Sequence, residues 1–237
     1  MCAMLTPPNK VEEPSDQLRQ MCLDIQSAVL AATKALLEAN LEQANQAISF
    51  GSEIALESGR CEHAAVTMLA TQAQSVCDLR QVTSAVQLVG DLARMGALSA
   101  HIANVARRRH PYSAVPESVR PVLHRMGETA AAIATSAVEV LQTKDPVAAA
   151  HIEGQDDAMD GLYRHLLDKI QTSNWDGGVS AARDLALVAR YYERFADHAV
   201  QVGRRTISLA TESDHRVQRH AATSTPRAAR NRAVVRV

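Results

Sequence analysis

Near-continuous helical periodicity is the feature of this sequence that most restricts its fold. Apolar residues recur at helical spacing over nearly all of residues 14–211, with only short breaks between the repeating stretches. A sustained alternation of β-branched and polar residues, the pattern of strands, is not found. Aromatic residues make up 3% of the chain, and a core poor in rings and rich in alanine and leucine suits closely packed helices. The sequence therefore predicts an all-α fold.

Six long helices are expected, and the breaks between them have chemical causes. Pro111 ends the third helix, because proline disfavours helical conformation in the residue before it. Pro116 and Pro146 suit the first turns of the fourth and fifth helices, where a missing N–H costs nothing. Asp176 is expected to cap the last helix. The predicted helices cover residues 15–39, 42–71, 76–109, 117–143, 146–172 and 177–211.

The two halves of the helical region resemble each other. A shift of 105 residues aligns Met21 with Met126, and a shift of 100 aligns residues 92–95 with residues 192–195. A three-helix unit is too thin to bury its apolar face alone, so two such units are expected to pack together. The predicted architecture is a tandem repeat of two three-helix bundles, with an N-terminal extension at 1–14, bundles at 15–109 and 117–211, and a basic disordered tail at 212–237.

The charge of the chain is divided unevenly. The formal net charge is −1, but residues 213–237 contain six arginines and a single acid, Asp214, so the rest of the chain is clearly acidic. An acidic body argues against nucleic-acid binding and favours partner surfaces that are basic or groove-like. The tail lacks an apolar period and is interpreted as a solvated terminus, with a binding arm for phosphate or anionic lipid as the alternative.

Neither export nor membrane insertion is indicated by the sequence. The amino-terminal residues lack the regions of a signal peptide, and no apolar run approaches the ~20 residues of a membrane helix. The four cysteines, Cys2, Cys22, Cys61 and Cys77, form no Cys-x-x-Cys pair, so reduced thiols are expected rather than a zinc site. A cytoplasmic protein is expected, with membrane contact only through partners.

Carboxylates in the second half of the chain form a candidate metal site. Asp157 and Asp160 lie three residues apart, and Glu193 and Asp197 lie four apart, so each pair occupies one face of its helix. If the two helices pack side by side, these oxygen-rich side chains suit a hard cation such as magnesium, manganese or iron. The cation would also remove the repulsion among the carboxylates. The full candidate set is Glu153, Asp156, Asp157, Asp160, Glu193 and Asp197.

The first half of the chain lacks the counterparts of these acids. The equivalent positions under the same alignment carry small residues, namely Ser52, Ala55, Ala93 and Ala97. One metal site is therefore predicted, not two. His198 follows Asp197 and points about 100° further round the helix, so it is expected to pack or to support the site rather than to bind metal.

Three alternatives to a regulatory metal site stay open from the residues alone. The acids could form a solvated helix face with ordinary salt bridges. A carboxylate-bridged di-iron enzyme would need paired Glu-x-x-His motifs, and the chain has a single one, at Glu212 and His215. A helical adaptor without metal is the third. No Walker A loop, Gly-x-Ser-x-Gly or His-Glu-x-x-His motif is found, so an enzyme is not expected.

The chain resembles the PhoU family over residues 15–211. In the first half the match is carried by Asp78-Leu79-Arg80 and by residues 92–97, where alanines replace the two acids of the family motif. In the second half the motif is present in residues 192–198, preceded by the acidic stretch 156–160. The resemblance implies a fold of two similar three-helix bundles. It also implies that carboxylates spaced as Glu/Asp-x-x-x-Asp bind iron, zinc or other divalent cations.

The resemblance further implies a role and partners. Members of the family repress the phosphate-starvation response when phosphate is ample. They act through contact with the ATPase subunit of the phosphate ABC transporter and with a membrane sensor histidine kinase. A non-enzymatic negative regulator of phosphate uptake and signalling is therefore expected, as a homodimer. The candidate partner contacts are the motif residues Asp78, Arg80, Arg94 and Arg194.

Overall fold

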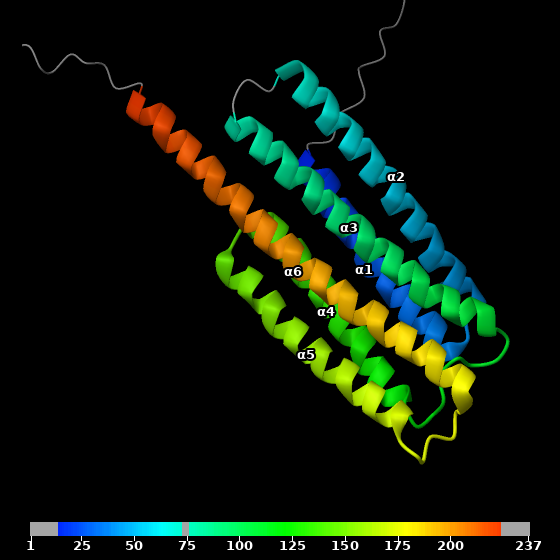
Figure 1. Ribbon diagram of the computed structural model, residues 1–237. Helices are drawn as coiled ribbons and strands as arrows, with labels where there is room; N and C mark the ends of the chain where they lie inside the picture. Colours follow the sequence, from blue (N-terminus) through cyan, green and yellow to red (C-terminus); the bar gives the residue numbers. More distant parts are fainter. Residues whose placement is uncertain (1–13, 73–75, 224–237) are drawn as a thin grey trace, which may run out of the picture.

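Six α-helices make up the described part of the chain, which is residues 14–72 and 76–223 of a computed structural model (Figure 1). The helices are α1 (Pro14–Glu38), α2 (Leu41–Gln72), α3 (Val76–Arg109), α4 (Arg120–Thr143), α5 (Pro146–Gln171) and α6 (Gly178–Thr223). The predicted all-α fold is confirmed. None of these helices combines the length and the apolar character needed to span a membrane.

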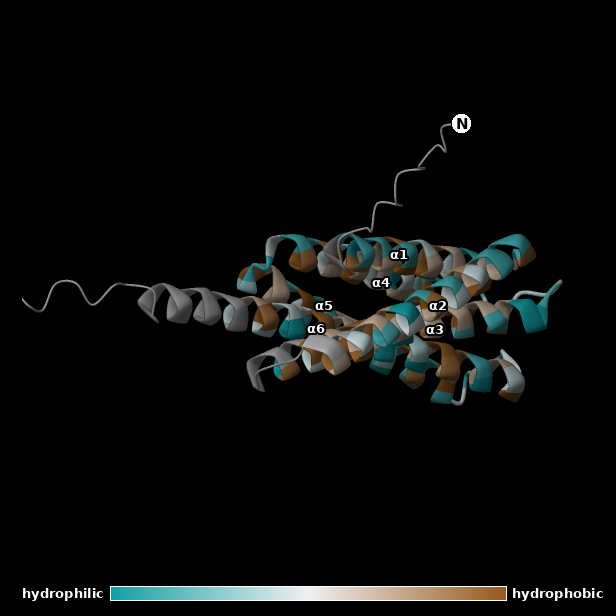
Figure 2. Ribbon diagram, turned by 90° about the horizontal axis from the view of Figure 1, so that it is seen from above, coloured by the Kyte–Doolittle hydropathy of each residue, from teal (hydrophilic) through white to brown (hydrophobic). Residues whose placement is uncertain are grey.

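The helices form two three-helix units that pack against each other. Within each unit all three helices touch: α1, α2 and α3 in the first, and α4, α5 and α6 in the second. The units meet through α1 against α4 and through α3 against α6. Figure 2 shows α1 and α4 along one side of the molecule and α3 and α6 toward the other. The outer helices α2 and α5 flank this four-helix centre, as the tandem repeat predicts.

Buried residues follow the repeat that the sequence predicts. Met21 of α1 and its counterpart Met126 of α4 are both buried, at 1% and 0% exposure. Leu92 of α3 and Tyr192 of α6, which the second shift aligns, are both fully buried. Equivalent positions therefore supply the core of both units, and α1, α3, α4 and α6 share one continuous apolar cluster.

The helix boundaries follow local chemistry, with three differences from prediction. Asn40 accepts a hydrogen bond from the Gln43 amide at 3.0 Å and starts α2, and Asp145 caps α5 in the same way. Pro116, however, precedes α4, which begins at Arg120 instead. Among the described residues, the Asp176 side chain makes no capping hydrogen bond to α6. Trp175 Nε1 donates to the Gly178 carbonyl at 3.0 Å there instead.

The third difference is at the end of α6, which continues past the predicted Thr211 to Thr223 and projects beyond the bundle (Figure 1). Between Thr211 and Pro226 the sequence has no helix breaker, and glutamate, arginine, glutamine and alanine favour helix. The helix thus runs into the segment predicted to be disordered. The rest of that tail, residues 224–237, lies outside the described residues.

A close contact between α1 and α4 depends on Gly127. A Cβ atom at Gly127 would lie 2.2 Å from Cγ2 of Thr33. Thr33 is held in place on both sides, because its hydroxyl donates to the Val29 carbonyl at 2.7 Å and lies 2.8 Å from the hydroxyl of Tyr192. The buried Tyr192 thereby links α6 to α1 across the two units.

Gly127→Ala is expected to lower the free energy of unfolding by about 1–3 kcal/mol, because the added methyl group overpacks the α1–α4 contact. Gly59→Ala is the matched control. It adds the same methyl group to a helix where no atom lies within 4 Å, so it should raise stability by about 0.5–1 kcal/mol through helix propensity. Urea unfolding of both variants measures the difference, and two equal shifts would contradict the packing.

Candidate metal site

The antiparallel helices α5 and α6 bring the predicted carboxylates into one electrostatic cluster. Asp156 and Asp160 of α5 interact with Glu193 and Asp197 of α6. Burial raises the pKa of Asp156 to about 6, and the neighbouring charges of Asp197, Asp160, Asp157 and Glu193 act in the same direction. The facing sides of α5 and α6 therefore bring several carboxylates together, and their negative charges repel one another because solvent only partly screens them.

Glu193 has a carboxylate oxygen that the protein leaves without a partner. Its Oε1 accepts a hydrogen bond from Arg190, one turn earlier on α6. Its Oε2 is buried and has no hydrogen-bond partner. Burial raises the pKa of Glu193, Asp197 raises it further, and Arg190 opposes the shift. A buried, unpaired acceptor in an acidic cluster fits a position that a cation would complete.

The other two predicted ligands lie at the edge of the cluster. Glu153 is paired with Arg204 of α6, with Nη2 2.8 Å from Oε1, so its charge is already balanced. Asp157 is exposed, and its negative charge contributes to the raised pKa of Asp156. In the described part of the chain, no three His, Cys, Asp or Glu side chains are arranged tightly enough to hold an ion as they stand. Small side-chain movements would have to draw the acids together around a cation.

Close helix packing replaces the acidic cluster in the first unit. Asp156 aligns with Gly51 and Ala196 with Gly96 under the two shifts. A Cβ atom at Gly51 would lie 2.9 Å from Cβ of Ala100, and one at Gly96 would lie 2.9 Å from Cδ1 of Ile54. The glycines let α2 and α3 approach each other closely at the level where α5 and α6 carry the acidic cluster.

A polar network between the units is the feature that sequence reasoning missed. Asp91 of α3 is 9% exposed and contacts two side chains of α6: its Oδ1 lies 3.0 Å from His198 Nδ1, and its Oδ2 accepts a hydrogen bond from Arg205 Nε at 2.8 Å. Burial alone would raise the pKa of Asp91, but these two bonds outweigh it and lower the pKa. The seven-residue spacing of His198 and Arg205, two helical turns, was the signal in the sequence that could have indicated a shared acid.

A second inter-unit ion pair lies near the ends of the same two helices. Asp184 of α6 is 4% exposed and accepts from Arg109 Nε of α3 at 2.7 Å, while Arg109 Nη2 also donates to Ser180. Arg183 donates to the other oxygen of Asp184 at 3.2 Å. The contact of His198 with Asp91 is consistent with the prediction that this side chain packs or supports the site rather than binding metal.

The predicted partner-contact residues divide into two groups. Arg80, Arg94 and Arg194 are exposed, and no carboxylate among the described side chains lies within ion-pair distance of them. The side chain of Asp78 lies outside what the structure describes. These arginines therefore do not neutralise the acidic cluster, whose nearest cationic partner is Arg190.

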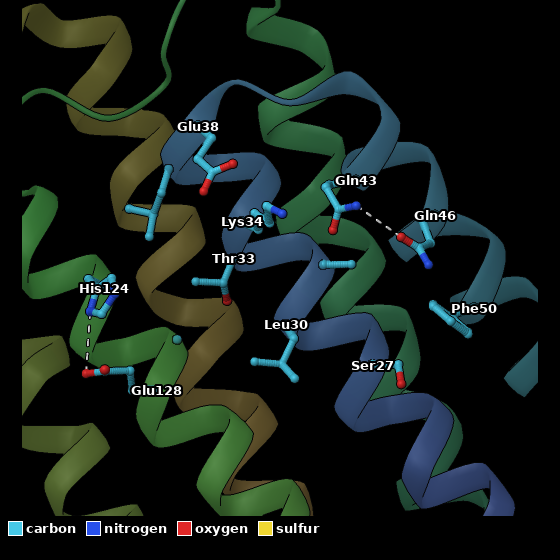
Figure 3. Close-up of a pocket in the computed structure, with 13 residues that line it drawn as sticks. Ser27, Leu30, Thr33, Lys34, Glu38, Gln43, Gln46, Phe50, His124 and Glu128 are labelled. Atoms are coloured by element: carbon cyan, nitrogen blue, oxygen red, sulfur yellow. Dashed lines mark hydrogen bonds and ion pairs between the residues drawn. The ribbon is translucent and has the colours of Figure 1, made fainter.

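An open groove of about 460 Å³ lies between α1, α2 and α4, away from the acidic cluster (Figure 3). Two pairs of its polar side chains contact each other: Gln43 donates to Gln46 at 3.2 Å, and His124 lies 3.4 Å from Glu128. Leu30 and Phe50 add apolar surface. The groove does not join a nucleophile to a base, so it has no arrangement that catalysis requires.

Comparison with known proteins identifies the family. The sequence matches the PhoU domain twice, over residues 18–106 and 123–206, which correspond to the two units. It is 48% identical to "Phosphate-specific transport system accessory protein PhoU homolog 2" of Mycobacterium tuberculosis, over 85% of this chain and 95% of the relative. It is 45% identical to homolog 1 of Mycobacterium leprae, over 86% and 92%. The chain belongs to the PhoU family.

Solved structures support the same fold. The crystal structure of PhoU from Pseudomonas aeruginosa superposes with a TM-score of 0.70 at 21% identity, over 83% of this chain and 94% of that one. PhoU from Streptococcus pneumoniae gives 0.69 at 21% identity, over 83% and 92%. At this identity the likeness concerns the fold, and it agrees with the paired three-helix units described above.

Proposed function

We propose that this chain is a non-enzymatic regulator of phosphate homeostasis that represses phosphate uptake and starvation signalling when phosphate is ample. The observation that carries the proposal is 48% identity over 95% of a relative named as an accessory protein of phosphate-specific transport. The described helices offer no catalytic constellation, so the output of the protein comes through binding. The proposed place of action is the cytoplasm.

The proposed partners are proteins of the transport and sensing machinery. They are the ATPase subunit of the phosphate ABC transporter and the sensor histidine kinase of the phosphate two-component system. The proposed active form is a homodimer, and membrane contact occurs only through these partners.

We further propose that the acidic cluster holds a divalent or trivalent cation. Asp156, Asp160, Glu193 and Asp197 would supply its ligands, with Glu153 and Asp157 beside them. The mutual repulsion of the carboxylates and the unpaired Oε2 of Glu193 support this assignment. An all-oxygen donor set favours magnesium, manganese or iron over zinc. When bound, the cation would supply positive charge that cancels the repulsion between α5 and α6.

Deleting the gene is expected to switch on phosphate-scavenging genes in phosphate-rich medium, because the repressing partner is gone. Mycobacterium tuberculosis has two PhoU homologs among the relatives, so the test belongs in a strain in which every PhoU gene is deleted. A phosphate-responsive reporter measures expression. Reintroducing residues 1–223 should restore repression, since the proposal places function in the helical body.

Two outcomes count against this proposal. A deletion strain whose reporter still follows external phosphate would remove the regulatory role. A 1–223 protein that folds but does not repress, beside a full-length chain that does, would move the function into the basic tail.

A further inference from the structure

Among the described side chains, most arginines without a carboxylate partner lie on α3, and one more, Arg194, lies on the neighbouring helix α6. On α1, α2 and α4, Arg19, Arg60 and Arg120 each have a carboxylate partner within 4 Å, and so does Arg204 on α6. Among the described side chains, Arg94, Arg107 and Arg108 of α3 and Arg194 of α6 have none. Arg125 and Arg164 are also without a carboxylate, but each stands singly on α4 or α5. Arginines without a carboxylate partner are therefore concentrated where α3 and α6 lie side by side, and are not spread evenly over the surface.

Helix geometry places these arginines on one side of the molecule. Arg94, His101 and Arg108 are exposed and follow one another at seven-residue intervals, which is two helical turns. Leu187, Tyr191 and Arg194 lie on one side of α6 at intervals of four and three. The rings of His101 and Tyr191 stack with their centroids 5.3 Å apart, so the two rows meet. These six residues are called the arginine face below.

The acids near the arginine face already bind other side chains of the protein or belong to the acidic cluster. Between residues 79 and 109, α3 has a single acid, Asp91, and it is buried against His198 and Arg205. Asp184 of α6 is buried against Arg109. The other acids of the body of α6, Glu193 and Asp197, belong to the cluster with α5. Among the described side chains, the guanidinium groups of the face therefore have no carboxylate partner within the molecule.

The first unit has small residues at the positions where the second unit has acids, so the part of α2 aligned with the acidic cluster lacks those carboxylates as well. Ala93 and Ala97 flank Arg94, and Ser52 and Ala55 stand at the aligned positions of α2. The first unit therefore presents a neutral surface beside an unpaired arginine, where the second unit presents an acidic one. Leu187 is 40% exposed and adds an apolar contact.

We infer that the arginine face is a docking surface for an acidic protein partner, one whose aspartate and glutamate side chains surround a small apolar patch. The inference rests on the proposed function, in which the chain acts by binding proteins. Guanidinium groups bind carboxylates through two parallel hydrogen bonds, and arginine and tyrosine are enriched at protein interfaces. The overall acidic charge of the body favours basic partner surfaces. The arginine face is locally positive, so at this surface an acidic partner is favoured instead.

The spacing of the face favours a protein over a membrane or a nucleic acid. Seven helical residues separate successive groups of α3 by about 10 Å, too sparse for the dense charge of a nucleic-acid backbone. A membrane-binding helix would present a broad apolar stripe, whereas this face exposes a single leucine among polar groups.

The test uses the full chain and two purified probes, the transporter ATPase subunit and the cytoplasmic region of the sensor kinase from the same organism. The variant is Arg94→Glu/Arg108→Glu/Arg194→Glu. Its matched control, Arg19→Glu/Arg60→Glu/Arg125→Glu, makes the same change in net charge on other helices. Binding of at least one probe should weaken about tenfold or more in the face variant and little in the control. Arg94→Lys/Arg108→Lys/Arg194→Lys should retain part of the affinity, because it keeps the charge.

The outcomes separate the inference from the proposed function. If wild-type protein binds a probe and the face variant binds it equally well, or the control loses as much, the inference is overturned and the regulatory role stands. If wild-type protein binds neither probe, both fail. Arginine-dependent binding to vesicles with anionic lipid, or to duplex DNA, in place of the proteins would overturn the choice of partner. Circular dichroism of each variant confirms that the helices are intact.

Discussion

Asp91→Ala is expected to lower the free energy of unfolding by about 2–4 kcal/mol, because it removes the carboxylate that joins His198 and Arg205 at the interface of the two units. Asp91 is 9% exposed, and its partners His198 and Arg205 both belong to α6. Without the Asp91 carboxylate, His198 loses its hydrogen bond to α3, whereas Arg205 keeps its hydrogen bond to Gln87 of α3. Chemical unfolding measured at pH 7 gives the difference.

Asp16→Ala is the control for this variant. Asp16 pairs with Arg19 at 3.9 Å on the surface of one helix, so its loss should change stability by less than about 0.5 kcal/mol. Equal effects of the two substitutions would contradict an inter-unit role for Asp91.

The contribution of Asp91 should also depend on pH in a defined direction. Its pKa is lower in the folded protein than in the unfolded chain, because the bonds to His198 and Arg205 outweigh the effect of burial. A group of this kind stabilises the fold above its unfolded pKa, about 3.9, and loses that effect as the pH falls through the folded pKa. The gap between wild type and Asp91→Ala should therefore narrow below about pH 4.

A divalent cation is expected to raise the melting temperature of the wild-type protein and to leave Glu193→Ala/Asp197→Ala unchanged. A ligand that binds only the native state stabilises it by about 2.7 kcal/mol at one hundred times its Kd. The double variant removes both α6 ligands, including the unpaired Oε2 of Glu193. Without cation it should be at least as stable as wild type at pH 8, because the repulsion among the carboxylates is reduced.

Protons should compete with the cation in this experiment. Burial and the neighbouring carboxylates raise the pKa of Asp156 to about 6, so the stabilisation by manganese or magnesium should grow as the pH rises from 5 to 7. A melting temperature that no cation changes at any pH in this range would remove the main support for the site.

The repeat and the meeting of α5 and α6 could be predicted because they depend on local spacing. Helical periodicity gives the helices, and the aligned Met21 and Met126 give the repeat. Once two helices of a unit are adjacent and antiparallel, acids at helical spacing on their facing sides come near each other. The prediction centred the α5 acids on Asp157 and Asp160, whereas in the structure Asp156 joins Asp160, Glu193 and Asp197, and Asp157 is exposed. None of these steps requires knowledge of how the two units are oriented.

The contacts between the units could not be predicted in this way. The bonds of Asp91 to His198 and of Thr33 to Tyr192 join residues more than 100 positions apart, on helices of different units. Which faces meet depends on the whole packing of α1, α3, α4 and α6. The pairing of Glu153 with Arg204 was missed for a related reason, because acids spaced for a metal were considered without the arginines of the facing helix.

The end of α6 shows the limit of composition as a guide. A basic segment without apolar period was interpreted as disordered from residue 212, yet the helix continues to Thr223. Absence of an apolar stripe argues against packing, but it does not stop a helix that is already formed from continuing through residues of good propensity.

Metal analysis of the purified protein tests the central claim most directly, namely that the second unit alone carries the cation site. Apo protein is loaded with manganese or iron, passed through a desalting column and assayed for bound metal. Wild type should retain metal, as should a variant with Ser52→Ala and Ala97→Ser in the first unit. Glu193→Ala/Asp197→Ala should retain none while its circular dichroism stays helical. Stoichiometric metal in that double variant, or none in the wild type, would contradict the account.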